Sequence, residues 1–117
     1  MKLITTHCIN SANEEVGLAA IDDPSVDGAN HEYEIRVAGT STKLKFQKGP
    51  IGAVGVNGIT HEVLLAVLID RLKGFQSGQF ACRENALALT KLEEATHWLN
   101  SRTRERVARG VEGTHQV

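Results

Sequence analysis

The segment that most constrains this chain is a long stretch without helix-breaking residues. Residues 82–109 contain neither glycine nor proline, and Gly110 follows them directly. Such a stretch predicts one continuous helix, because glycine and proline are the residues that most disfavour a helix interior and glycine is common just after a helix end. A second apolar segment precedes it, and the short sequence Ser77-Gly78 separates the two. We therefore expect an αα-hairpin.

The earlier helix of this hairpin is expected over about 61–75. Thr60 is the expected N-cap, and Glu62 places a negative charge where the helix dipole favours one. From Val63 to Ile69 the segment is apolar on nearly every side, which is typical of a helix that is buried on several faces. One companion helix and a small β-hairpin cannot cover all of these faces, so self-association is the simplest explanation.

The preceding part of the chain, residues 1–58, predicts a small antiparallel β-region. Residues 31–37 alternate apolar and charged side chains with a period of two, and a second alternating stretch contains Leu44 and Phe46. The turn-forming residues 38–41 connect the two stretches. We therefore expect a β-hairpin with one apolar and one charged face.

The remaining segments have weaker patterns. We expect a short strand within Lys2–Ile9, a loop over Ser11–Asn30, a glycine-rich loop over Lys48–Gly58, and a loosely ordered tail over 111–117. The sequence thus predicts an oligomeric α+β protein with an N-terminal β-region over 1–58, a helical hairpin over 59–110 with helices at about 61–75 and 82–109, and a C-terminal tail.

Composition narrows the classes of protein to consider. The 117 residues include 13 Lys and Arg against 14 Asp and Glu, a formal net charge of −1, which argues against a protein that coats nucleic acid or an anionic membrane. The two cysteines, Cys8 and Cys82, stand in no ligand spacing, as expected in a reducing compartment. No stretch approaches the ~20 apolar residues of a membrane span, and the N-terminus lacks signal-peptide features. We expect a cytosolic protein.

Spacing by threes and fours along the second helix defines one face with an unusual composition. Its centre is apolar and small, whereas Asn85 lies near its start and two arginines lie near its end. A polar residue on such a face is costly unless it meets a partner. The face consists of Ala81, Asn85, Ala88, Leu92, Ala95, Leu99, Arg102 and Arg106.

The two polar ends of this face are too far apart to hold one small ligand within a single chain. Asn85 and Arg102 are 17 residues apart, which corresponds to about 25 Å along one helix. If the helix packs antiparallel against its copy in a second chain, Asn85 of one chain meets Arg102 and Arg106 of the other, and two-fold symmetry generates two equal pockets. Phe75 precedes the turn and would lie near Asn85 of its own chain.

Each such pocket would combine an aromatic ring, an amide and two guanidinium groups. Arginines bind phosphate and stack on bases, aromatic rings stack on bases, and an amide can bind a base edge or a ribose hydroxyl. This set suits a small nucleotide with at least two negative charges. In the structural alternative, Asn85 fixes the helix register and the arginines complement the helix dipole. Spacing alone favours this alternative, because charged last turns are common.

Other candidate sites are weaker. The glycine series KGPIGAVGVNG matches neither the Walker nor the dinucleotide pattern, so we expect a connector with unusual dihedral angles. Cys82 lies at a helix start, where a thiolate would be stabilised, but no base is identified and we expect a small buried cysteine. No nucleophile, base and oxyanion donor are assembled. We therefore expect no enzymatic activity. We also expect no metal and no cofactor, because no ligand spacing joins the five histidines, which are His7, His31, His61, His97 and His115.

Three runs of the sequence resemble a known phage family. These runs are FQKGPIGAVGVNGIT, IDRLKGFQSGQFACRENALALTKLEEATHWL and RTRERVARGVEGTH, and the first begins at Phe46. They are similar to the Thoeris anti-defence protein family, whose C-terminal helical hairpin is shared with a related anti-CBASS sponge. Residues 1–30 carry little of this resemblance.

The resemblance implies a sponge that sequesters cyclic nucleotide immune messengers in the cytoplasm of the infected bacterial host and leaves them intact. It implies binding of glycocyclic ADP-ribose at a subunit interface, separate pockets for CBASS cyclic oligonucleotides in some members, and dimers that group into hexamers. The family's ligand contacts correspond to Phe75, Asn85, Arg102 and Arg106. Phe75 and Arg102 would sandwich the base, while Asn85 and Arg106 would bind hydroxyl or phosphate groups. With this resemblance added, we favour the ligand pocket.

An alternative from a different class stays open. Residues 101–110 carry four arginines and one glutamate, so a basic-ended hairpin could dock on nucleic acid or on a host protein as a phage regulator. The net charge counts against nucleic acid, and we expect neither nucleic acid nor a membrane as a partner. A hydrolase that destroys the messenger would need catalytic groups that the sequence does not show.

Overall fold

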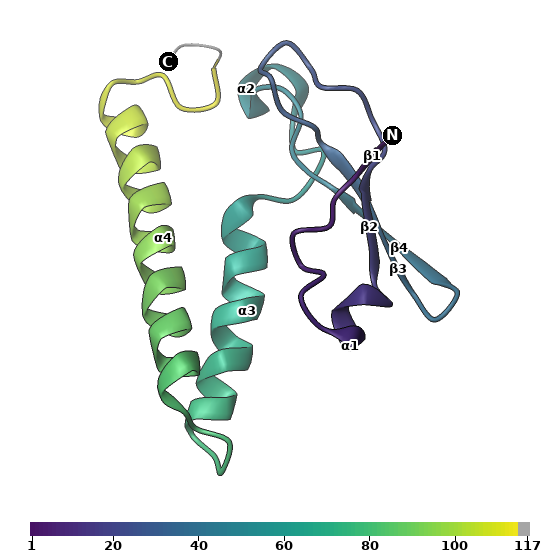
Figure 1. The fold of residues 1–117 in the computed structure, drawn as a ribbon. Coiled ribbons are helices and arrows are strands. Elements are labelled where there is room, and N and C mark those ends of the chain that lie inside the picture. The colour runs from purple at the N-terminus through teal and green to yellow at the C-terminus, as the bar shows by residue number, and fades with distance from the viewer. Residues whose placement is uncertain (115–117) are drawn as a thin grey trace. The chain divides into compact units, whose positions relative to one another are not determined.

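The computed structural model describes residues 1–114 and divides into two compact units. A sheet unit comprises residues 1–48 and 56–59, and a helical unit comprises residues 49–55 and the chain from Thr60 onward. Strands precede the long helices along the chain (Figure 1), as the expected α+β fold requires. The last three residues of the predicted tail, which include His115, lie outside the described residues.

The sheet unit contains four antiparallel strands in the order β1-β2-β3-β4. Their bounds are Lys2–Leu3 for β1, Gly17–Ala20 for β2, Glu32–Val37 for β3 and Thr40–Lys45 for β4. The antiparallel β-region is therefore confirmed, although the strand expected within Lys2–Ile9 is short. A turn closed by a bond from the Cys8 N–H to the Thr5 carbonyl (2.9 Å) follows it.

The loop expected over Ser11–Asn30 is wrong for two of its segments. A short helix α1 covers Ser11–Glu14, and the side chain of Asn10 caps it by accepting a hydrogen bond from the backbone N–H of Asn13 (2.9 Å). Strand β2 pairs on both sides, and its Ala19 and Ala20 are buried. Its sequence, Gly-Leu-Ala-Ala, has no alternation of apolar and polar side chains, so the pattern did not predict a strand. Small residues are sufficient to fill the buried positions of this inner strand.

Strands β3 and β4 form the expected hairpin. The register pairs Tyr33 with Leu44 on one face and Glu34 with Lys43 on the other, so one face is apolar and the other charged. The turn is tighter than expected, since Ala38 (φ 49°) and Gly39 (φ 80°) alone connect the strands. Positive φ at both positions is the geometry that matches the twist of a two-residue hairpin.

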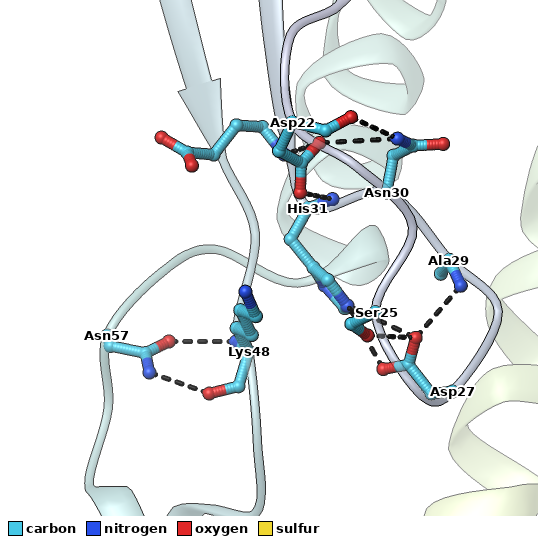
Figure 2. Close-up of polar contacts among 9 residues, drawn as sticks. Asp22, Ser25, Asp27, Ala29, Asn30, His31, Lys48 and Asn57 are labelled. Atoms are coloured by element: carbon cyan, nitrogen blue, oxygen red, sulfur yellow. Dashed lines mark hydrogen bonds and ion pairs between the residues drawn. The ribbon is translucent and has the colours of Figure 1, made fainter.

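The base of the glycine-rich loop is closed within the sheet unit. The Asn57 side chain accepts a hydrogen bond from the Lys48 N–H (2.8 Å) and donates one to the Lys48 carbonyl (2.7 Å), as Figure 2 shows. Ile59 continues this closure through a parallel bridge to Phe46. The approach is so close that a Cβ on Gly58 would lie 2.3 Å from the carbonyl carbon of Phe46. There is thus no room for a side chain at position 58, and only glycine fits there.

The loop expected over Lys48–Gly58 is wrong for residues 51–54, which form the short helix α2 (Ile51–Val54) of the helical unit. Pro50 occupies the N-cap position, and Gly55 ends the helix with φ 75°. The sequence did not predict this single helical turn, because two of residues 51–55 are glycines and glycine disfavours helix interiors.

The helical unit contains the expected αα-hairpin (Figure 1), with α3 over His61–Gln76 and α4 over Arg83–Ala108. The hydroxyl of Thr60 caps α3 by accepting a hydrogen bond from the Val63 N–H (3.4 Å). Within the predicted tail over 111–117, residues 111–114 contact the rest of the helical unit. Val111 is buried, and the Gly113 carbonyl accepts a hydrogen bond from the Gly52 N–H of α2 (3.0 Å).

The loop between β2 and β3 is crosslinked by two aspartates (Figure 2). Asp22 accepts hydrogen bonds from the backbone N–H groups of His31 (2.9 Å) and Glu32 (3.2 Å), and the bond from His31 is the main reason that its pKa lies below its usual value. Asp27 accepts bonds from the Ser25 hydroxyl and the Ala29 N–H, which lower its pKa in the same way. Both carboxylates therefore stabilise the fold while they are ionised.

Substitution of Gly58 and Gly74 by alanine should change stability in opposite directions. Gly58→Ala should lower the free energy of unfolding by about 3 kcal/mol or more, since the new methyl group meets backbone atoms that cannot move aside. Gly74 lies within α3, and a Cβ there would meet open space, so Gly74→Ala should raise stability by up to about 1 kcal/mol. Urea denaturation of both variants checks this. Equal midpoints would contradict the close approach at Gly58.

Acidification should destabilise the sheet unit through Asp22 and Asp27. A pKa that is lower in the folded chain than in the unfolded one gives stability that is present above the unfolded value of about 3.8 and is lost as the pH falls through the folded value. Thermal denaturation between pH 6 and pH 2 should show this loss, and Asp27→Asn should reduce it. Asp23→Asn, at an exposed neighbouring position, is the control. Identical pH profiles of the wild type and Asp27→Asn would contradict the assignment.

Candidate functional site

The predicted site residues lie at the two ends of the helical hairpin, and three of them belong to one continuous helix. Helix α4 runs from Arg83 to Ala108 without interruption, so Asn85 is in its first turn and Arg102 is near its end. Phe75 lies in the last turn of α3, at the same end of the hairpin as Asn85. Figure 1 shows α3 and α4 joined by the short connection at that end. A single chain therefore places Phe75 and Asn85 at one end of the hairpin and Arg102 and Arg106 at the other, and we refer to these two ends as the half-sites of the candidate site.

The half-site at the hairpin turn presents an aromatic ring and an amide. The Phe75 ring is half-buried, with the guanidinium carbon of Arg71 5.0 Å from its centroid and the Phe80 ring edge-on at 6.5 Å. The half-buried side-chain amide of Asn85 makes no hydrogen bond with any residue of 1–114. Sequence analysis missed Arg71, although it lies one helical turn before Phe75, where such a cation–π pair is expected.

Cys82 lies beside this half-site and differs from the expectation of a buried cysteine. Its side chain is exposed, and its sulfur caps α4 by accepting a hydrogen bond from the Asn85 N–H (3.4 Å). The Cys82 N–H in turn donates to the side chain of Gln76 (3.0 Å). The thiol thus takes the place that a serine or threonine hydroxyl usually fills at a helix start.

The half-site at the other end of α4 contains two arginines in different environments. Arg102 is exposed and makes no ion pair or hydrogen bond through its side chain with the described residues. Arg106 is only 6% exposed, and its Nη2 donates hydrogen bonds to the carbonyls of Val111 (3.0 Å) and Thr114 (3.1 Å). The carboxylate of Glu112 lies 3.3 Å from its Nε. Arg102 is accessible to a ligand, whereas Arg106 also holds the chain after Gly110.

Two cavities of the sheet unit provide a comparison with these half-sites. One of about 130 Å³ is lined by His7, Val16, Leu18 and Ile35 and is apolar. Another of about 300 Å³ lies along the first three strands. Neither cavity includes Phe75, Asn85, Arg102 or Arg106.

One cluster of the sheet unit has the residue types of a hydrolytic triad but not its arrangement. In such a triad the acid and the nucleophile bond to opposite ring nitrogens of the histidine. Here the Ser25 hydroxyl and the Asp27 carboxylate both lie 3.0 Å from Nε2 of His31 (Figure 2), and the hydroxyl donates to the carboxylate. The cluster therefore crosslinks the loop and does not activate the serine.

Residues 1–114 contain no group of three or more His, Cys, Asp or Glu side chains placed to hold a metal ion. Within the same residues, no helix has the length and apolar character needed to span a membrane.

Comparison with known proteins identifies the family of the helical hairpin. The family model described as the Acb2/Tad1 hairpin domain matches residues 41–104, which include Phe75, Asn85 and Arg102. The protein named Thoeris anti-defense 1, from Bacillus phage SBSphiJ7, is 56% identical over 79 residues, or 68% of this chain. The match spans 56% of the length of that relative. Because the family model covers more than half of the chain, the protein belongs to the Acb2/Tad1 hairpin domain family.

Proposed function

We propose that the protein is a phage anti-defence sponge, which binds cyclic nucleotide immune messengers and sequesters them without cleavage. Glycocyclic ADP-ribose is the first candidate ligand, and CBASS cyclic oligonucleotides are a second class. The proposal is supported by the family and by a relative whose name states an action against Thoeris defence. The place of action would be the cytoplasm of the infected bacterial host, where such messengers are made.

The observation that carries this proposal is the pair of half-sites at the two ends of α4. Asn85 and Arg102 are separated by about 25 Å on an unbroken helix, and each presents a side chain without a partner among the described residues. Antiparallel packing of two copies along α4 would place the turn half-site of one chain against the arginine half-site of the other. Both halves are then needed, and a dimer has two equivalent pockets.

The exposed apolar surface of the helical unit supports such self-association. Val63, Val67 and Leu68 of α3 are 50%, 59% and 46% exposed, and Trp98 of α4 is 63% exposed. Among the described residues of this unit, the only buried hydrophobic side chain is that of Val111. Full burial of a Val or Leu side chain contributes about 1.5–3 kcal/mol. Assembly into dimers, and of dimers into hexamers, would supply the burial that one chain lacks.

The four side chains suit the parts of a cyclic dinucleotide-like ligand. Phe75 and Arg102 would stack on the two faces of a base, and Asn85 would bind a hydroxyl or phosphate oxygen. Arg102 and Asn85 give up no protein contact on binding. Arg106 would contribute a second guanidinium to the phosphates. With no assembled nucleophile and base among these four residues, the pocket would retain its ligand intact.

The exposed arginines favour one alternative, which is docking on nucleic acid. Arg102 and Arg104 are both exposed on the last turns of α4. Binding to several phosphates of nucleic acid would weaken steeply with salt, whereas binding of an enclosed small ligand would depend on salt more gently.

Incubation with glycocyclic ADP-ribose tests the sponge directly. After free ligand is removed by filtration, heat denaturation of the protein should release the intact messenger in near-stoichiometric amount, because the pocket binds without chemistry. Mass spectrometry of the released material is the measurement. Release of a new product would show catalysis, and recovery of all ligand in the filtrate would contradict binding of this messenger and direct the test to cyclic oligonucleotides.

Replacement of Arg102 by alanine should greatly weaken binding of the messenger. Loss of a desolvated arginine–anion contact costs on the order of 2–5 kcal/mol, which corresponds to a rise in Kd of about 30-fold or more. Isothermal titration calorimetry checks this, with sedimentation to confirm an unchanged assembly. Arg104→Ala removes the same charge from a neighbouring exposed position and should change Kd by less than about threefold. Equal effects of the two substitutions would indicate general electrostatic attraction and contradict the pocket.

A further inference from the structure

We propose that Glu112 is an internal anion that occupies Arg106 in the free protein and that an anionic ligand must displace. This inference rests on the proposed function, because it treats Arg106 as part of the ligand pocket. It assigns to Glu112 control over which anions this arginine accepts. The Glu112 carboxylate forms an ion pair with the Nε edge of Arg106 without a hydrogen bond there, so a phosphate oxygen that binds this edge must take the place of the carboxylate.

The contacts of Glu112 show a carboxylate held in place at both oxygens. Its Oε2 lies 3.3 Å from Nε of Arg106, and its Oε1 accepts a hydrogen bond from the Gly113 N–H (3.3 Å). The side chain of Arg106 is 8% exposed and that of Glu112 is 39% exposed. The ion pair is therefore shielded from water on the arginine side and open on the carboxylate side, where an incoming anion would replace it.

The segment that carries Glu112 is itself fixed to the rest of the helical unit. Arg106 binds the carbonyls of Val111 and Thr114, and the Gly113 carbonyl accepts the Gly52 N–H. A Cβ on Gly52 would lie 2.8 Å from that carbonyl oxygen, so the approach depends on glycine. A carboxylate on a fixed segment is present at a high effective concentration, which makes it a strong competitor for a weak anion.

The consequence is selection by charge. A monoanion that meets Arg106 gains little more than the Glu112 carboxylate already provides. A ligand with several negative charges can contact Arg102 as well, and this second contact offsets the loss of the Arg106–Glu112 pair. Glu112 thus discriminates against common small anions and in favour of ligands that reach both arginines.

Titration of the full-length protein with inorganic pyrophosphate tests this inference without dependence on the messenger. Glu112→Gln should bind pyrophosphate about five- to tenfold more tightly than the wild type, because the charged competitor for Arg106 is removed. This change in affinity corresponds to about 1–1.4 kcal/mol of binding free energy. Glu105→Gln is the matched control. Glu105 has the same charge, lies at the same end of α4 and pairs with exposed Arg109, so its substitution should change pyrophosphate affinity by less than about twofold.

Two further variants assign the effect to the contact. The double variant Glu112→Gln with Arg106→Ala should lose the gain in affinity. Glu112→Asp keeps the charge but shortens the side chain, so it should show part of the gain, and it provides a second test if Glu112→Gln does not fold. Thermal denaturation of each variant checks that the fold is intact.

The outcomes separate this inference from the proposed function. Equal gains for Glu112→Gln and Glu105→Gln, or a gain that persists without Arg106, would overturn the role of Glu112. If Glu112→Gln alone gains affinity for pyrophosphate while the wild type fails to bind glycocyclic ADP-ribose, the internal anion stands and the choice of messenger is wrong. Binding of the messenger by the wild type with no change in Glu112→Gln for either ligand would overturn the internal anion and keep the sponge.

Discussion

Backbone hydrogen bonds run without interruption from Arg83 to Ala108, and this continuity fixes the distance between the two half-sites of the helical unit. A straight helix cannot bring Asn85 to Arg102, so a ligand that needs both must lie between chains. Helix α3 has 16 residues and α4 has 26, so α3 cannot accompany α4 along its whole length. The length of α4 therefore prevents a pocket within one chain, and it also leaves a helix surface on which a second chain would complete such a pocket.

In the proposed pocket, the two arginines of α4 would have different roles, which their sequence spacing does not show. Arg102 is exposed and without a partner among residues 1–114, while Arg106 is almost fully buried against the segment after Gly110. A buried guanidinium with fixed acceptors is already organised, but in the proposed pocket a ligand would have to replace its ionic partner Glu112. An exposed guanidinium such as that of Arg102 must become ordered when it binds a ligand, but it loses no contact with the protein. A pocket that combines them would bind tightly only when a ligand satisfies both requirements.

Sequence pattern predicted the regular parts of this fold. Helix α4 was predicted because its sequence lacks Gly and Pro, α3 because it has an N-cap and an apolar segment, and the hairpin of β3 and β4 because its side chains alternate with a period of two. Strand β2 was missed because Gly-Leu-Ala-Ala has no alternation, and α2 was missed because Gly52 interrupts it. The order of residues 111–114 depends on Arg106 and on Gly52, which lies far away in the sequence. Local pattern contains no information about such a contact.

The candidate site shows the same division between what spacing can and cannot reveal. Spacing placed Asn85 and Arg102 on one face and gave their separation, and α4 has the length that this argument requires. It could not show that Arg106 and Glu112 would meet, since Gly110 ends the helix between them and helical periodicity stops there. The ion pair depends on the turn after α4, where the chain turns back and brings Glu112 next to Arg106 in the last turn of the helix. For this protein, the chemistry at the end of α4 therefore depends on both the regular helix and the irregular segment that follows it.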